Sequence, residues 1–426
     1  MLERDTIRQT IVDQRPVLVP ADFIEREAYS VLQNSQQTSS IVILLGVRRC
    51  GKSTLLQKLR LDSLESDYYI NFDDDRLAQF TVDDFQTLYE LFIELYGQQK
   101  IFFFDEIQNI PQWERFVRRL HDLGYKIYIT GSNASLFSQE LGTRLTGRYI
   151  EIFVYPFSFT EFLRLKSPTL LSKKNLATAD KGMLKHACQQ YLTLGGFPNY
   201  LEFEDKNYLK SLYESILYRD IITRYHITSV QAIKELVFYL ASNVSKDMSY
   251  NAVKNMLGLK NPTTVKDYCD YLSMSFLCFF VMRYDPSVKK QILHTKKVYF
   301  IDTALTYLIG FRHSDDFGRL IENVVFLELK RRGFEVFFHK EKKECDFVLR
   351  ERGHITQAIQ VCYSLEDEKT KERELAGLIE ALSTYQLQAG WIITWDDEKT
   401  LEIDTDAGEK TIHIISLYRW LLWPDF

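Results

Sequence analysis

The chain has 426 residues, 46% of them hydrophobic, and a formal net charge of −5. This length and composition fit about three globular domains with cores of their own, and the negative net charge argues against a general polyanion binder. The most apolar stretch, residues 276–282, is too short to cross a bilayer, and residues 1–5 do not open a secretory signal. The six cysteines include no C-x-x-C pair, which argues against a zinc site or a disulfide framework and fits a reducing compartment. We therefore expect a cytoplasmic protein without membrane contact.

The first informative elements are a strand and a glycine-rich loop. Residues 41–45 are all apolar, which is typical of a buried parallel strand, and residues 54–59 fit the start of an amphipathic helix. The loop between them matches the phosphate-binding pattern G-x-x-x-x-G-K-[ST]. Its glycines let successive amides, together with the positive end of the following helix, point at one anion. We predict an ATP site formed by Gly46, Val47, Arg48, Arg49, Cys50, Gly51, Lys52, Ser53 and Thr54.

Specific roles follow for four residues in and beyond this loop. Lys52 would reach the β- and γ-phosphates, and the hydroxyl of Ser53 would bind Mg²⁺. Residues 100–104 read as another strand, which ends in the acids Asp105 and Glu106. We expect this strand to lie beside the loop strand, so that Asp105 shares the Mg²⁺ and Glu106 orients or deprotonates water. The alternative is an acidic strand end that only faces solvent.

More strands follow, at residues 126–130 and 149–154, in addition to one at 68–72. Asn133, just after the first of these, is the candidate sensor of the γ-phosphate, although Asn is also a favoured helix cap. Arg148 precedes the strand at 149–154. An arginine at the γ-phosphate can accelerate hydrolysis by roughly 10³ to 10⁵, and the alternative is a pair with a surface acid. The sequence leaves open whether Arg148 serves its own site or that of a neighbouring subunit.

Together these motifs resemble the AAA-type P-loop ATPases of the bacterial and archaeal group in which an N-terminal motor precedes a long C-terminal region. The resemblance rests on residues 46–54, 104–108, 130–133 and 145–148, followed by 155–162. It implies ATP and Mg²⁺ as cofactors. It also implies the same roles for the loop lysine and serine, for the two acids and for Asn133, whereas an arginine finger at Arg148 is a hypothesis.

The middle of the chain is predicted to be helical. Residues 166–229 form a helical segment that is broken by the pair Gly195-Gly196, and they either couple nucleotide state to the remaining chain or simply pack. Residues 230–312 then have the order of a winged helix: three helices followed by two strands with a lysine-bearing loop between them. Such modules bind nucleic acid or dock proteins. The candidate nucleic-acid contacts are Thr264, Lys266, Lys289, Lys290, Lys296 and Lys297.

Residues 313–426 read as helix, three strands, helix and strand, an order that resembles the restriction-endonuclease-like fold. In that fold a helix Glu, a strand Asp and a Glu/Gln-x-Lys motif surround Mg²⁺. The positions that match are Glu322, Asp346 and Gln360, but Cys362 stands where the lysine belongs. A cysteine supplies no cation, so we expect a nuclease-like domain that has lost, or never had, hydrolytic activity. The alternative is that Glu322 and Asp346 are a helix-face charge and a strand-end acid of a binding domain. Another lysine in the same space would restore activity, the candidates being Lys340, Lys342, Lys343 and Lys371.

The expected fold is therefore α/β, with a P-loop parallel-sheet motor at 1–165, a helical segment at 166–229, a winged helix at 230–312 and a nuclease-like α/β domain at 313–426. The predicted function is Mg²⁺-dependent ATP hydrolysis that drives or switches the later parts, with double-stranded DNA as the first candidate partner. One alternative is a nucleotide-gated regulator with little turnover and a protein partner. Another is an ATP-licensed DNA nuclease. The sequence leaves open whether copies of the chain form a homo-oligomer.

Overall fold

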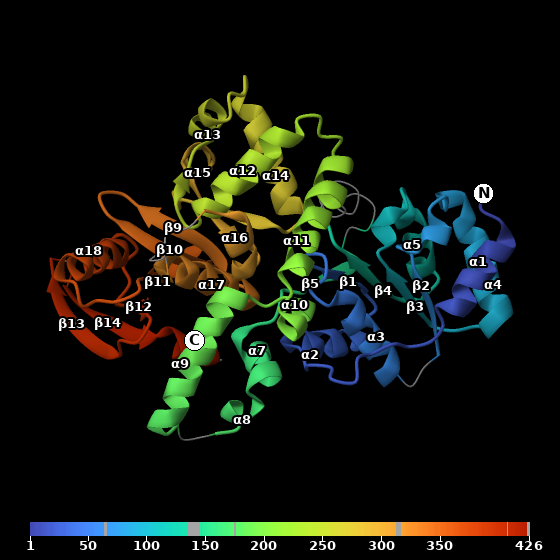
Figure 1. The fold of residues 1–426 in the computed structure, drawn as a ribbon, viewed down its shortest axis with the longest axis horizontal. Helices are drawn as coiled ribbons and strands as arrows, with labels where there is room; N and C mark the ends of the chain where they lie inside the picture. The colour runs from blue at the N-terminus through green and yellow to red at the C-terminus, as the bar shows by residue number, and fades with distance from the viewer. Residues whose placement is uncertain are drawn as a thin grey trace. The chain divides into compact units, whose positions relative to one another are not determined.

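The computed structural model describes residues 1–63, 66–134, 145, 147–173, 176–311, 317–406 and 408–423. The chain divides into two compact units, and Figure 1 labels most of their elements. The first comprises residues 1–156 and 274–276, and the second comprises residues 157–273 and 277–426. The predicted helical, winged-helix and nuclease-like parts therefore lie in one unit, apart from residues 274–276, and that unit also contains the end of the predicted motor, residues 157–165. Within the described ranges, we find no helix with the length and apolar character that a membrane span requires.

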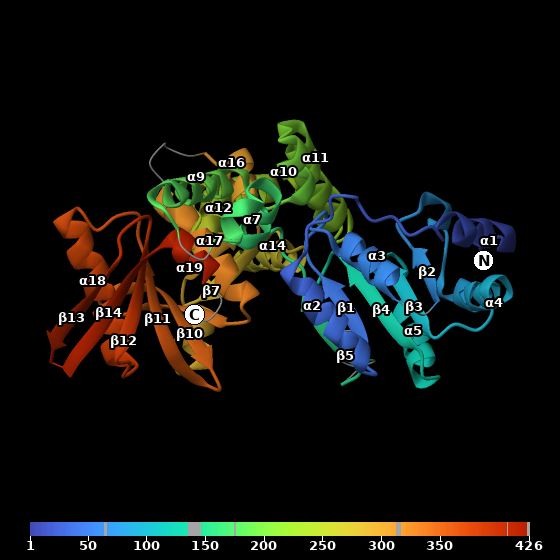
Figure 2. The same ribbon diagram turned by 90° about the horizontal axis from the view of Figure 1, so that it is seen from below.

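The first unit is built on a parallel sheet of five strands in the order β2-β3-β4-β1-β5. The strands are β1 (Ile41–Leu45), β2 (Asp67–Asn71), β3 (Ile101–Asp105), β4 (Lys126–Gly131) and β5 (Tyr149–Phe153). The helices are α1 (Arg4–Asp13), α2 (Glu27–Asn34), α3 (Lys52–Asp62), α4 (Phe85–Tyr96) and α5 (Trp113–Asp122). Helices α4 and α5 make the crossovers between the parallel neighbours β2, β3 and β4, and α3 connects β1 to β2. Figure 2 shows this sheet from another side.

The apolar runs of the sequence become the central strands of this sheet. Phe102, Phe103 and Phe104 on β3 are fully buried, because a strand in the middle of a parallel sheet is covered on both faces. The ring of Phe103 stacks on that of Tyr128 in β4, with 4.9 Å between centroids. Phe103 and Tyr128 are also paired in the register of the two strands, so β3 and β4 run side by side toward the predicted site residues that follow them.

One expectation about the sheet was wrong. We expected β3 to lie beside the loop strand β1, whereas β4 lies between them. Strand pairing depends on contacts between segments far apart in the chain, so a local pattern of apolar residues predicts a strand but not its neighbour. The carboxyl ends of β1, β3 and β4 nevertheless lie at one edge of the sheet, because all three strands are parallel.

The second unit opens with helices and a small antiparallel sheet in the order β6-β8-β7. Before the sheet lie α7 (Phe159–Lys166), α8 (Pro168–Leu171), α9 (Thr178–Leu194), α10 (Pro198–Phe203), α11 (Lys206–Ser215), a π-helix (Ile216–Thr223) and α12 (Val230–Ser242). Around the strands the order is β6 (Asp247–Met248), α13 (Tyr250–Met256), α14 (Pro262–Met274), β7 (Cys278–Met282), α15 (Val288–Leu293), β8 (Lys296–Phe300) and α16 (Thr303–Ile309). Helix α15 occupies the connection that we expected to be a loop.

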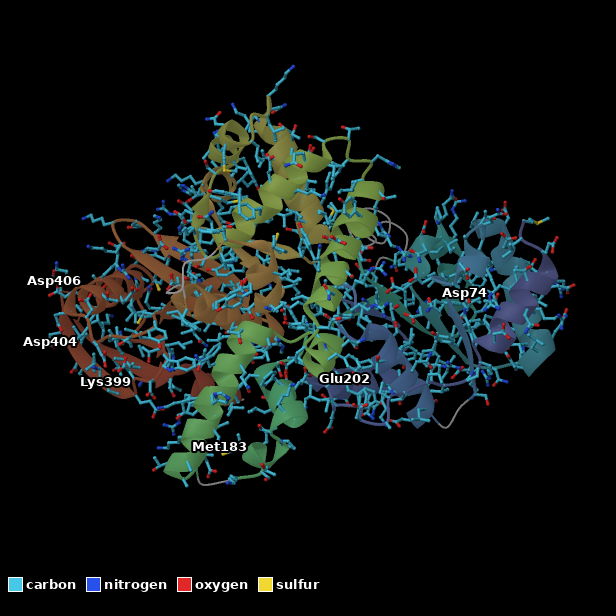
Figure 3. The ribbon with its side chains drawn as sticks, viewed as in Figure 1. Asp74, Met183, Glu202, Lys399, Asp404 and Asp406 are labelled. Carbon is cyan, nitrogen blue, oxygen red and sulfur yellow. The ribbon has the colours of Figure 1, made fainter. Side chains whose placement is uncertain are left out.

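The rest of this unit is a sheet of six strands in the order β13-β14-β12-β11-β10-β9. Its elements are α17 (Phe317–Arg331), β9 (Glu335–Lys340), β10 (Glu344–Glu351), β11 (His354–Val361), α18 (Glu368–Thr384), β12 (Ala389–Thr394), β13 (Lys399–Thr405), β14 (Gly408–Ser416) and α19 (Leu417–Leu422). The edge strand β13 carries charges such as Lys399 and Asp404, labelled in Figure 3, which discourage pairing with another chain. The helix and the three strands that we predicted at the start of the nuclease-like part correspond to α17, β9, β10 and β11.

Candidate active site

The glycine-rich loop follows β1 and ends where α3 begins, at Lys52. Gly46 (φ 154°) and Gly51 (φ 104°) both have positive φ. A β-carbon at Gly46 would lie 2.1 Å from the carbonyl oxygen of Val154, so the loop can pack against the end of β5 only with glycine there. Arg49 also has a positive φ, of 65°. The first-turn amides of α3 have no partner within the helix, and the positive end of the helix dipole lies at the same place, which suits an anion.

The remaining loop residues lie around this turn. Val47 and Cys50 are buried, Arg49 is exposed, and burial raises the pKa of the Cys50 thiol. The Lys52 side chain is buried, and its ammonium donates to the carbonyl oxygens of Gly46 and Val47 at 3.0 and 3.1 Å. The loop therefore holds a cation inside its own curve, where phosphate oxygens could replace the carbonyl oxygens as partners.

Ser53 and Asp105 meet as predicted. The Ser53 hydroxyl donates to Oδ1 of Asp105 at 3.0 Å, and Thr130 also donates to that oxygen. Burial and the nearby charge of Glu106 raise the pKa of Asp105 to about 6. A hydroxyl and a buried carboxylate are hard oxygen donors of the kind that Mg²⁺ binds, and a divalent cation would relieve the burial of this charge. The residues present therefore fit an Mg²⁺ ion held by Ser53 and Asp105.

Glu106 lies next to the same lysine and is held in a fixed orientation. Its backbone is left-handed, with φ at 52°, and its amide donates to Thr130 at 2.9 Å. Its carboxylate lies 3.8 Å from the Lys52 ammonium and accepts from Gln108 and from the Ser132 hydroxyl, the latter at 3.2 Å. A non-glycine residue in this conformation costs about 1 kcal/mol or more, and such strain clusters at functional sites. Glu106 is thus the carboxylate best placed to orient a water.

The end of β4 contributes more than we predicted. Asn133, the predicted sensor, is fully buried and follows that strand. Thr130 and Ser132 were not among the predicted site residues, yet they contact Asp105 and Glu106 respectively. The two are spaced by two residues, the period that places side chains on one face of a strand, and this spacing was the available signal. Gln108 was also missed, because it lies after β3 in a short 3₁₀ turn.

Arg26 is the fourth residue that sequence reasoning missed. It lies just before α2, and its side chain is buried. Its Nη1 donates to the carbonyl oxygen of Cys50 at 2.9 Å, and its Nη2 donates to that of Tyr155 at 2.6 Å. Arg26 therefore ties the back of the phosphate-binding loop to the chain that leaves β5. No local pattern in the sequence marks it.

The structure contradicts a role for Arg148 at its own subunit's site. Its carbonyl oxygen accepts the amide of Ile41, so it lies at the amino end of β1, whereas the phosphate-binding loop follows the carboxyl end. Five residues of strand separate the two ends by about 16 Å at about 3.3 Å per residue. The guanidinium instead lies 3.1 Å from the carboxylate of Asp122, and the two side chains are 35% and 51% exposed. An action on a neighbouring subunit's site stays a prediction.

The predicted nucleic-acid contacts lie in the second unit and are only partly accessible. Lys266, Lys289 and Lys290 are exposed, and Thr264 is half-buried, as is Lys296, whose ammonium lies over the ring of Tyr250. Lys297 is wrong as a contact, because its side chain is only 2% exposed. Its ammonium instead pairs with Glu322 and Asp346, two of the three predicted nuclease-like positions. The third, Gln360, accepts the amide of Asp346.

Comparison with known proteins agrees with the geometry of the first unit. A protein-family profile described as "AAA domain" (AAA_14) matches residues 38–163, which include the glycine-rich loop and both acids. The match and the parallel five-stranded sheet identify an AAA-type P-loop ATPase domain, a kind of domain that binds and hydrolyses ATP. A second profile, described as a domain of unknown function (DUF8612), matches residues 185–315.

Two relatives match almost the whole chain. The uncharacterized protein MJ1544 of Methanocaldococcus jannaschii is 33% identical over 97% of this chain and 94% of its own length. An uncharacterized protein of Haemophilus influenzae is 33% identical over 94% of this chain and 99% of its own length. A solved structure, the Walker-type ATPase PABY2304 of Pyrococcus abyssi, is 18% identical with a TM-score of 0.45, over 70% of this chain and 99% of that one. The AAA domain occupies residues 38–163 of this chain. Because the chain is 33% identical to MJ1544 over almost its full length, it belongs to the same family as that protein.

Proposed function

We propose that this protein hydrolyses ATP with Mg²⁺ in the first unit and uses the change of nucleotide to switch the second unit. The observation that supports this most directly is the contact of 3.0 Å between Ser53 and the buried Asp105, next to the loop that encloses Lys52. When bound, Mg²⁺ would neutralise part of the charge on the β- and γ-phosphates. The products would be ADP and phosphate.

This chain's own residues would divide the work as follows. Lys52 would exchange the carbonyl oxygens of its loop for phosphate oxygens and hold the developing negative charge. Glu106 would accept a hydrogen bond from the attacking water and align it with the γ-phosphate. Gln108 and Ser132 keep the Glu106 carboxylate in place for that task.

The test is ATP turnover and ATP binding in the full-length chain. Glu106→Gln should lower kcat at least about 10²-fold and preserve ATP binding, because general acid–base groups contribute roughly 10² to 10⁴ in rate. The matched control is Glu94→Gln, at a half-exposed glutamate on α4 that should leave turnover unchanged. Unchanged turnover in Glu106→Gln would contradict the hydrolytic role and favour a nucleotide-gated binding protein.

For the partner of the second unit, we propose nucleic acid, with double-stranded DNA as the first candidate. The support is a group of exposed basic side chains: Lys266 on α14, and Lys289 and Lys290 on α15. The elements of residues 230–300 also follow the order of a winged helix, with α14 as the helix for a major groove. Asp267 and Asp270 share the exposed side of α14, so the basic face is interrupted.

Salt dependence tests this partner. Binding of double-stranded DNA by the Lys289→Ala/Lys290→Ala double variant should lose about 1.8 from the slope of log K against log salt, since each phosphate contact contributes about 0.9. Lys399→Ala, on the edge strand β13, is the control. An unchanged slope in the double variant, or no effect of any nucleic acid on ATP turnover, would count against nucleic acid.

A protein partner is the second candidate, and one observation favours it. Helix α15 exposes three apolar side chains, Val288, Ile292 and Leu293, which are 67%, 58% and 73% exposed. Apolar groups contribute little to contacts with phosphates, whereas they are common at protein interfaces. If DNA leaves ATP turnover unchanged, the Leu293→Ser variant should instead lose the response to the protein partner.

A further inference from the structure

A buried ammonium lies at the acidic centre of the nuclease-like part. The side chain of Lys297 is 2% exposed, and its Nζ lies 2.8 Å from Glu344, 2.8 Å from Asp346 and 3.2 Å from Glu322. The ammonium has three protons, so these three carboxylates use all of its donors. The hydroxyl of Tyr299 also donates to Oε1 of Glu322, at 2.7 Å.

The four charged residues come from three elements that are separate in the sequence. Lys297 and Tyr299 are two residues apart on β8 and share a face, as Glu344 and Asp346 do on β10. Glu322 lies on α17. The centre therefore joins the small sheet β6-β8-β7 to the helix and sheet of the nuclease-like part.

Other polar atoms around this centre are also paired. Oδ2 of Asp346 accepts the amide of Val361 at 3.0 Å, and the amide of Asp346 donates to the side-chain oxygen of Gln360 at 3.2 Å. The Gln360 amide group in turn donates to Glu374 on α18. Glu344 also pairs with Lys340, at 2.8 Å. Each of the three predicted metal-site positions is therefore satisfied by the protein itself.

This arrangement does not fit a divalent cation. Mg²⁺ needs about six oxygens in a nearly octahedral shell, and a second cation among these carboxylates would repel the ammonium. Burial would lower the pKa of Lys297, but Asp346 and Glu322 raise that pKa well above its ordinary value, so the ammonium stays charged at neutral pH. As they are placed around the ammonium, these carboxylates do not form a metal-ligand group, and no other group of three or more His, Cys, Asp or Glu does so among the residues that the structure describes.

We propose that the ammonium of Lys297 takes the place of the metal in this centre, so that the centre is a fixed ion cluster that joins β8, α17 and β10 and excludes divalent cations. The lysine missing at Cys362 is thus not replaced by a nearby lysine that assists a metal. It is replaced by a lysine from another sheet that occupies the metal's own position. The acids remain, and removal of the ammonium exposes a latent cation site.

The experiment counts Mn²⁺ bound to the full-length, nucleotide-free chain, from the paramagnetic resonance signal of free Mn²⁺. Ser53→Ala serves as the background, because it weakens the cation site of the first unit. In that background, adding Asp346→Asn should leave the Mn²⁺ count unchanged. Adding Lys297→Met should raise the count by one per chain, and the further addition of Asp346→Asn should remove that ion.

Two results would overturn the proposal. The first is a loss of bound Mn²⁺ when Asp346→Asn is introduced beside an intact Lys297, which would mean that metal and ammonium share the centre. The second is a folded Lys297→Met chain that gains no Mn²⁺. If Lys297→Met does not fold, as judged by circular dichroism, the first comparison alone decides. Nicking of plasmid DNA with Mg²⁺ that is lost in Asp346→Asn would overturn it as well.

Discussion

At the scale of single residues, Arg26 shows how the phosphate-binding loop is held from behind. Its two hydrogen bonds reach the carbonyl oxygens of Cys50 in the loop and of Tyr155 beyond β5. The chain enters the second unit at Phe157, two residues after Tyr155. A shift of the loop on nucleotide binding would therefore act, through this guanidinium, on the segment that leads into the second unit.

We predict that Arg26→Ala weakens ATP binding by roughly 10- to 100-fold. Hydrogen bonds from charged groups contribute about 1.5–3 kcal/mol each, and the variant also leaves two carbonyl oxygens without this donor. Calorimetric titration of ATP in the Glu106→Gln background measures the effect. Arg8→Ala, which removes an exposed arginine that pairs with Glu94, should bind ATP normally. Equal affinity in the two variants would show that Arg26 does not position the loop.

Asp302 is a buried carboxylate that depends on backbone donors. It accepts the amide of Gly196 at 2.6 Å and that of Ala304 at 2.9 Å. Burial raises its pKa from 3.8 to about 7. The folded state therefore binds the Asp302 proton more strongly than the unfolded state does. The stabilisation from this protonated carboxyl is fully present below about pH 4 and is lost as pH rises to about 7.

Asp302→Asn removes this titration, so the free energy of unfolding of the wild type minus that of the variant should fall by about 3 kcal/mol between pH 5 and pH 8. Thermal or denaturant unfolding at the two pH values measures this difference. Asp404→Asn, at an exposed position on β13, provides the comparison and should show a difference that does not depend on pH. A pH-independent difference for Asp302→Asn would mean that this carboxyl is already ionised in the folded chain.

The sequence predicted the residues whose roles depend on neighbours in the chain and missed those that depend on distant partners. Lys52 and Ser53 lie in one continuous motif, and Asp105 with Glu106 closes a recognisable strand. The partners of Lys297 lie 25 and 49 residues further along the chain, and Arg26 contacts Tyr155 from 129 residues away. No periodicity or motif encodes such pairings, because they arise only when the sheets are assembled.

At the scale of elements, the same limit applies to the sheets. The apolar runs at β1, β3 and β4 predicted each strand, because burial on both faces requires continuous apolar sequence. The order of the strands depends on contacts between segments far apart in the chain, which a local apolar run does not show. We therefore placed β3 next to β1, although the partner of both is β4.

Two helical glycines provide a matched pair of predictions at this scale. Gly377 lies in α18 where a β-carbon would be 2.0 Å from the carbonyl oxygen of Glu344 on β10, whereas Gly182 in α9 has nothing within 4 Å. Gly377→Ala should therefore push α18 away from the sheet and destabilise the second unit by roughly 1–3 kcal/mol. Gly182→Ala should stabilise it by about 0.5–1 kcal/mol, because alanine favours the helix.

Thermal unfolding of the two variants measures both changes in stability, a loss for Gly377→Ala and a gain for Gly182→Ala. The shared change from glycine to alanine cancels the general effect of helix propensity, so the difference between the variants reports the close approach of α18 to β10. Equal shifts for Gly377→Ala and Gly182→Ala would mean that α18 and β10 can separate at little cost.

At the scale of the whole molecule, the chain divides into two units where the sequence suggested four domains. The predicted boundaries lie where the motifs change, but contacts cross the boundary at residue 312. Tyr284, after β7, donates its amide to the carbonyl oxygen of Phe338 on β9 at 2.9 Å. Lys340 on β9 likewise pairs with Asp247 on β6, at 2.5 Å. These contacts join the small sheet to the six-stranded sheet within the second unit. The four-part division stays a prediction about sequence modules.

Two units with separate cores predict two unfolding transitions, only one of which contains the ATP site. In the non-hydrolysing Glu106→Gln chain, Mg²⁺ and ATP at about 100 times the dissociation constant should stabilise the first unit by about 2.7 kcal/mol. Scanning calorimetry measures the transitions, and Gly377→Ala identifies the one that belongs to the second unit by lowering it. Lys52→Ala should abolish the response to ATP. If ATP shifts only the transition that Gly377→Ala lowers, the assignment of the ATP site to the first unit is wrong. If ATP shifts both transitions, the shift of the second measures the coupling on which the proposed switch depends.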